Sequence, residues 1–138
     1  MYAGRIRMRE REVQQFKDQK EMLEGRKARL EKARTQLSSS EGTLDGHAPL
    51  IKDPAINSAQ WKGRKADKHE EYRESMKEGQ SKGRQRIADL RELIQDAIAN
   101  ADSGIRYCSA QAGWRERELK TLNRQQRRFE AAKASESS

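Results

Sequence analysis

The sequence predicts an all-α fold, an antiparallel helical hairpin with a long, extended, coiled-coil-like second helix. Three observations lead to this prediction. Only 33% of the 138 residues are hydrophobic and 38% are charged, which leaves too few apolar side chains for a thick core. Both prolines, Pro49 and Pro54, lie in one short region, so the stretches on either side contain no helix breaker. Large apolar residues recur at helical spacing on both sides of it.

The first helix is expected from about residue 4 to about residue 40. Its seam is marked by large apolar residues spaced by seven, namely Phe16, Leu23, Leu30, Leu37 and Leu44. Most residues three positions earlier are charged, so the seam is one residue wide over most of its length. Gly25 costs the helix a further ~1 kcal/mol relative to alanine. Such a helix must pack on another element to persist.

A turn is expected over about residues 41–60, where serine, glycine, proline, asparagine and histidine dominate. The second helix is expected over about residues 61–132, followed by a disordered tail at 133–138. These elements together make a single helical-hairpin domain that covers residues 1–138.

The second helix carries an apolar stripe that steps by three or four residues. The stripe follows Ile87, Leu90, Ile94, Ile98, Ala101, Ile105, Cys108, Ala112, Arg115, Leu119, Leu122, Gln126 and Phe129. Its phase continues through Asp102-Ser103-Gly104 with one stutter between Ile94 and Ile98. This favours one helix, with a bend at Gly104 left open, over two helices joined by a tight turn.

The two predicted helices differ in length. About 37 residues span roughly 55 Å and about 70 residues span roughly 105 Å, so the first helix would cover the second only up to about residue 100. The stripe beyond residue 105 would then need a helix from another chain, or a bend near Gly104. The predicted partner-binding residues are Ile98, Ile105, Cys108, Ala112, Leu119, Leu122 and Phe129.

The charges are interleaved along the whole chain despite a net charge of +8, which favours a solvated helix surface over a nucleic-acid patch. The single cysteine, Cys108, has no internal disulfide partner and is expected to be a small buried hydrophobe. His69 is expected to be a packed hairpin residue, because neither histidine has a second ligand at metal-binding spacing. We therefore expect no catalytic residues, no metal site and no cofactor.

The amino-terminal residues lack the apolar core of a signal peptide, and no run reaches the length of a membrane span. The expected location is cytoplasmic, and any export would need a route without a signal peptide.

The triplet Trp61-Lys62-Gly63 lies at the junction of the predicted turn and the second helix. A tryptophan ring there can lie across both helices, and a glycine two residues later lets the backbones approach closely. A purely structural role, in which the ring closes the end of the hairpin, fits the same residues.

The helix, the turn, the Trp-x-Gly triplet and the following Ala66, His69 and Tyr72 resemble the WXG hairpin proteins of type VII (Esx) secretion in Gram-positive bacteria. The likeness is closest to the YwqH-like small accessory proteins encoded beside LXG toxins. It implies a non-catalytic adaptor or chaperone that binds the N-terminal LXG domain of a toxin, often with a second small helical protein. The residues it marks for the hairpin tip and export motif are Trp61, Gly63, Ala66, His69 and Tyr72.

The chain departs from that family at its export tag, Tyr-x-x-x-Asp or Glu, which is missing. The signal could therefore reside on a partner, or this chain could remain inside the cell. Two alternatives stay open: a basic coiled coil that associates with nucleic acid, and a structural coiled coil that forms homo-oligomers through the same stripe.

Overall fold

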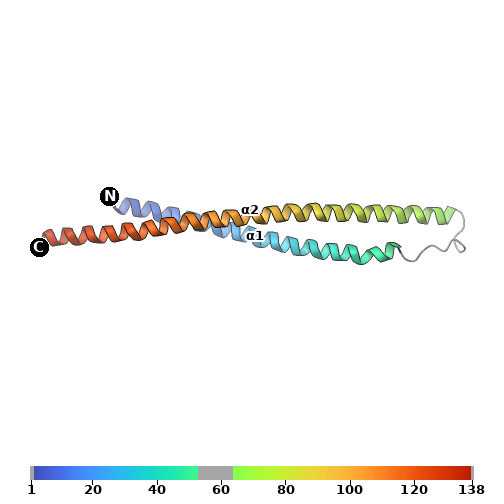
Figure 1. Ribbon diagram of the computed structural model, residues 1–138, viewed down its shortest axis with the longest axis horizontal. Coiled ribbons are helices and arrows are strands. Elements are labelled where there is room, and N and C mark those ends of the chain that lie inside the picture. The colour runs from blue at the N-terminus through green and yellow to red at the C-terminus, as the bar shows by residue number, and fades with distance from the viewer. Residues whose placement is uncertain (1, 53–63, 138) are drawn as a thin grey trace. The chain divides into compact units, whose positions relative to one another are not determined.

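The fold consists of two α-helices in the part of the chain that the structure describes, residues 2–52 and 64–137 of a computed structural model (Figure 1). Helix α1 is Tyr2–Lys52 with 51 residues, and helix α2 is Arg64–Ser137 with 74 residues. No strand occurs within these two ranges. The predicted all-α helical hairpin with a longer second helix is therefore confirmed.

Each helix contributes to two compact units. Unit 1 contains Met1–Arg29 and Ile98–Ser138, and unit 2 contains Leu30–Ala97. In both units a stretch of α1 packs on a stretch of α2, and the contacts show that the stretches are antiparallel. In unit 1, Lys27 pairs with Asp102 and Lys17 with Glu116.

Helix α1 ends later than predicted, because residues 41–52 of the expected turn are helical. The small polar residues that suggested a turn are accommodated inside the helix. The hydroxyl group of Thr43, inside the expected turn, donates a hydrogen bond to the carbonyl oxygen four residues earlier, as Thr35 and Ser39 do in the turns of the helix just before it. The expected disordered tail is also wrong in part, since α2 continues through residues 133–137.

Unit 1 contains all the buried residues of the described chain. They are Ile6 and Val13 of α1, and Ile98, Ala101, Cys108, Ala112 and Leu122 of α2. The stripe beyond residue 105, which was expected to lack a partner within the chain, is therefore covered by the start of α1. The expectation is wrong because α1 continues to Lys52 and pairs in a register that sets Glu12 against Arg115 and Tyr2 against Phe129, near the C-terminal end of α2.

Gly104 lies inside the continuous α2, so the alternative of two helices joined by a turn is excluded. A Cβ atom added at Gly104 would lie 2.8 Å from Cδ1 of Leu23, which is closer than atoms normally pack. The glycine thus lets Leu23 of α1 approach the backbone of α2. Ala101 and Cys108, one turn away on either side, are small residues that are also buried.

In unit 2, none of the described residues is buried. Ile87 and Ile94 of the predicted stripe are half-buried against α1, but Leu90 is 48% exposed. Its place in the stripe is taken by Arg91, which forms an ion pair with Glu41 of α1. With Arg91 in place of Leu90, the packed positions of α2 step regularly by four and three from Ile87 onward, and the predicted stutter disappears.

The close contact at Gly104 leads to a prediction about two glycines of unit 1. Replacing a helical glycine by alanine normally stabilises a protein by about 1 kcal/mol. Gly113→Ala should show this gain, because its Cβ would meet only the Arg117 side chain at an ordinary 3.6 Å. Gly104→Ala should gain less, because Leu23 must move, and Gly104→Leu should destabilise by about 1–3 kcal/mol.

The free energy of unfolding in urea measures all three variants. Equal gains for the two alanine variants would show that the approach of Leu23 to Gly104 does not limit the packing.

Candidate partner-binding surface

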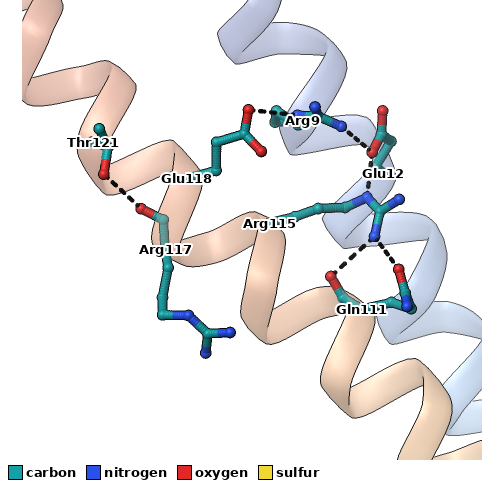
Figure 2. Close-up of polar contacts among 7 residues, drawn as sticks. All are labelled: Arg9, Glu12, Gln111, Arg115, Arg117, Glu118 and Thr121. Atoms are coloured by element: carbon teal, nitrogen blue, oxygen red, sulfur yellow. Dashed lines mark hydrogen bonds and ion pairs between the residues drawn. The ribbon is translucent and has the colours of Figure 1, made fainter.

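A polar network joins the two helices in unit 1 (Figure 2). Oε2 of Glu12 accepts hydrogen bonds from Arg9 Nη1 at 2.9 Å and from Nε of Arg115. Nε of Arg9 also lies 3.2 Å from a carboxylate oxygen of Glu118. The Arg115 Nη1 group donates to the backbone oxygen of Gln111 at 3.2 Å and to its side-chain oxygen at 2.6 Å. Two arginines and two glutamates thus cross-link α1 and α2.

The network exists because Arg115 occupies a position of the packed stripe, seven residues from the buried Cys108 and seven from the buried Leu122. A guanidinium group that is largely withdrawn from water needs charged and hydrogen-bonding partners. Glu12 and Gln111 supply them. The sequence pattern placed Arg115 on the stripe but did not reveal its partners, because Glu12 lies more than a hundred residues away.

The network shifts the ionisation of its members. The hydrogen bond from Arg115 lowers the pKa of Glu12 against the effect of partial burial, and the hydrogen bond from Arg9 lowers it further. The pKa of Arg9 is raised, first by its hydrogen bond to Glu12 and also by the charge of Glu118. The network therefore stabilises the charged forms of both residues.

Two aromatic side chains of α2 are held at the surface next to this network. Trp114 is 45% exposed, and the guanidinium groups of Arg9 and Arg115 lie over its ring at 4.9 and 4.7 Å. Tyr107 is 59% exposed and meets the ring of Phe16 edge-on, with centroids 6.1 Å apart. Both rings are thus positioned by contacts inside unit 1 while one side stays open to solvent.

These aromatic residues belong to a row of exposed side chains along α2, which we call the outer face of unit 1. Its members are Tyr107, Ala110, Trp114, Arg117 and Arg124, which are spaced by three, four, three and seven residues. An open hollow of about 490 Å³ lies along this row and is lined by Ala110, Gln111, Trp114, Arg115 and Arg117. The spacing puts these residues on one side of the helix.

Beyond Trp114 the outer face becomes basic, and Lys120 and Arg127 lie beside its member Arg124. The side chains of Arg117, Lys120, Arg124 and Arg127 are exposed, and none of them forms an ion pair with another residue of the described chain. Unit 1 carries 17 basic and 10 acidic residues, whereas unit 2 carries 13 and 12. Nearly all of the net positive charge is therefore in unit 1, which the interleaved pattern of the sequence did not suggest.

The structure places the predicted hairpin-tip residues as follows. Trp61 and Gly63 lie outside the described residues, and Ala66 is in α2 but its side chain is not described. His69 is exposed, so it is not the packed residue that the sequence suggested, and Tyr72 is 69% exposed. A role of this motif in export stays a prediction.

The predicted partner-binding residues are mostly covered by the chain itself. Four of them are buried, namely Ile98, Cys108, Ala112 and Leu122. Two are half-buried, Ile105 and Leu119, and Phe129 is exposed. Phe129 is 56% exposed and its ring lies 6.0 Å from that of Tyr2. The buried residues were assigned to a partner because the stripe was expected to be uncovered, and the chain itself covers it. The exposed residues of α2 are therefore the candidates for partner binding.

Comparison with known families agrees with the resemblance drawn from the motif. The model of the YwqH-like family matches residues 4–133. The chain belongs to the YwqH-like family. Among curated proteins and among solved structures, none is significantly similar to this YwqH-like chain. Neither described helix contains a stretch apolar and long enough to cross a membrane, and no potential metal-binding group of three histidine, cysteine or acidic residues occurs in those helices.

The lowered pKa of Glu12 predicts how the stability of this YwqH-like protein depends on pH. The ionised carboxylate stabilises the folded state at any pH above the ordinary glutamate value of 4.5, and this contribution is lost as the pH falls through the lower folded value. The thermal midpoint should therefore fall between about pH 5 and about pH 3. Glu12→Gln should have a lower midpoint at neutral pH and a smaller further fall in acid.

Circular dichroism during heating gives these midpoints. Glu10→Gln is the matched control, because Glu10 is exposed and forms no ion pair within the described residues. It should keep the wild-type pH dependence, and an unchanged acid transition in Glu12→Gln would contradict the role given to Glu12.

Proposed function

We propose that this YwqH-like protein acts by binding, as a non-catalytic adaptor for the N-terminal LXG domain of a type VII secreted toxin, and that it helps the toxin's export. Membership in the family supports this proposal. The observation that carries it is the outer face of unit 1, where Tyr107 and Trp114 are exposed although the chain has only three tyrosines and two tryptophans.

Exposed aromatic and arginine side chains are the usual anchors of protein–protein interfaces. Anchors that are already held in place lose little conformational freedom on binding, which favours affinity. The ring of Trp114 is held by the guanidinium groups of Arg9 and Arg115, and the ring of Tyr107 is held by the ring of Phe16. Together with the hollow beside Trp114, they form a surface suited to an amphipathic helix.

The basic residues of the outer face and those beside it also limit the chemistry of the partner. Arg117, Lys120, Arg124 and Arg127 have no counter-charges in the described chain, so we expect the LXG helix to carry carboxylates beside its apolar residues. A second small helical protein could use the apolar hollow at Tyr2, Ala3 and Phe129. The export signal would then come from a partner, because this sequence lacks the tag.

Co-expression with the LXG-domain protein encoded beside the gene tests the proposal. The two proteins should purify as a stable complex. Trp114→Ala should weaken it about 30-fold or more, since truncating a central aromatic anchor typically costs about 2 kcal/mol or more. Arg117→Glu with Arg124→Glu should weaken it as well and remove its dependence on salt.

Met22→Ala is the matched control, because Met22 is a large apolar residue of unit 1 that is 56% exposed on α1, away from the outer face. It should leave the affinity unchanged. Failure of the wild-type proteins to associate would reject the adaptor function. A complex whose affinity is unchanged by Trp114→Ala would support the adaptor function but reject the outer face of unit 1 as the binding surface.

The uncompensated basic residues favour nucleic acid as the second candidate partner. Titration with duplex and single-stranded nucleic acid at increasing salt separates the two. Binding that is tight at low salt and falls steeply as salt rises would favour this alternative over the adaptor.

A further inference from the structure

A second row of side chains follows α2 in unit 2, beside the stripe that packs on α1. It steps alternately by four and three residues, and we call it the outer seam of unit 2. Its members are Tyr72, Met76, Gly79, Gly83, Arg86, Leu90, Leu93 and Ala97. This alternation is the heptad pattern of a helix that packs on another helix. The packed residues Ile87 and Ile94 belong to the neighbouring stripe.

The chain covers the outer seam only at its edge, where a Cβ atom at Gly83 would lie 3.5 Å from Leu44 of α1. Tyr72 is 69% exposed, Met76 56%, Leu90 48% and Leu93 64%. A Cβ atom at Gly79 would meet no other atom within 4 Å, so no contact in the described chain explains a glycine in the middle of this helix. A helix that approaches from outside would explain it, because glycine leaves room for a large side chain.

We propose that the outer seam binds the outer seam of a second copy of this chain, with the two α2 helices antiparallel. One register matches a large residue with a small one at three of its four pairs and two apolar residues, Leu93 and Met76, at the fourth. Leu90 of each copy lies opposite Gly79 of the other, and Leu93 opposite Met76. In the same register Tyr72 lies opposite Ala97, and Arg86 opposite Gly83. A parallel pairing in register would instead place Gly79 on Gly79 and Arg86 on Arg86, which leaves a gap and sets like charges together.

Charge at the edge of the seam supports the same register. In antiparallel helix pairs the residues that flank the seam on one side face each other. Here Lys82 of one copy faces Asp89 of the other, and two-fold symmetry forms the pair twice. Within the described chain Lys82 has only a loose pair with Glu78 at 3.6 Å, with both side chains about 70% exposed. Asp89 accepts a hydrogen bond from Gln85 at 2.9 Å and has no ion pair there.

The proposal is independent of the toxin partner, because it uses unit 2 and the adaptor proposal uses unit 1. The opposing side of α2 offers a matched control. Ala88 is exposed and lies about half a helical turn from the outer seam, so Ala88→Glu adds the same charge outside the contact. Leu93 is largely exposed in the single chain, so Leu93→Glu should leave the helix content intact.

The test is the molar mass of the full-length protein, measured by light scattering over a range of concentrations. The wild type and Ala88→Glu should dimerise, whereas Leu93→Glu should dimerise at least about tenfold more weakly. Lys82→Asp alone and Asp89→Lys alone should each weaken the dimer, because each sets like charges opposite one another. The combined Lys82→Asp, Asp89→Lys chain should recover the dimer affinity of the wild type to within about threefold, because both ion pairs form again with their charges exchanged.

Circular dichroism confirms that each variant keeps its helices. A wild-type chain that stays monomeric at about 100 μM would overturn the proposal. A dimer whose affinity is unaffected by Leu93→Glu would also overturn it. So would a combined Lys82→Asp, Asp89→Lys chain that dimerises as weakly as either single variant, because that result would reject the antiparallel register.

Discussion

Charged side chains inside a narrow helix–helix seam are the constraint on which this structure depends. A seam of leucines spaced by seven can slip by one heptad and still bury similar residues. Here Arg115 meets Glu12 and Arg9 meets Glu118 in unit 1, and Arg91 meets Glu41 in unit 2. A slip by seven residues would separate these charges and leave them partly desolvated, which is costly. The ion pairs therefore fix which residues of α1 lie opposite which residues of α2.

The two units bury their apolar surface to different degrees. In unit 1 Gly104 lets Leu23 approach the backbone of α2, and all the buried residues of the described chain lie there. Unit 2 contains larger side chains that remain half-exposed along both of its helices. Local stability generally follows buried apolar contact, so unit 1 should resist opening more than unit 2 does. The difference leaves more apolar side-chain surface exposed to solvent in unit 2.

Periodicity and composition predicted much of this fold. The all-α class, the continuous second helix through Gly104 and the family resemblance from Trp61-Lys62-Gly63 all followed from the residues, and the family is confirmed. The end of α1 could not be predicted, because serine, threonine and glycine are as compatible with a turn as with an exposed helix. The error in the packed stripe had a different source. Hydrophobicity favours Leu90 over Arg91, and only the distant Glu41 explains why the arginine packs.

The candidate surface was harder to predict than the fold. Its aromatic members lie one helical position away from the buried stripe, and the contacts that position them come from Arg9 and Phe16, about a hundred residues earlier in the chain. No local pattern in α2 records those contacts. The distribution of net charge between the units was hidden for a similar reason, because the units combine segments from both ends of the sequence.

The lone thiol of this chain has a consequence for studying its motion. Cys108 is 3% exposed, lies between the helices of unit 1 and donates a weak hydrogen bond to Gln19 at 3.8 Å. An alkylating reagent can reach the sulfur only when α1 and α2 separate at that point. The rate of labelling therefore reports how often α1 and α2 separate locally in the native protein. Cys108 serves as a natural probe of this motion, and no cysteine has to be introduced.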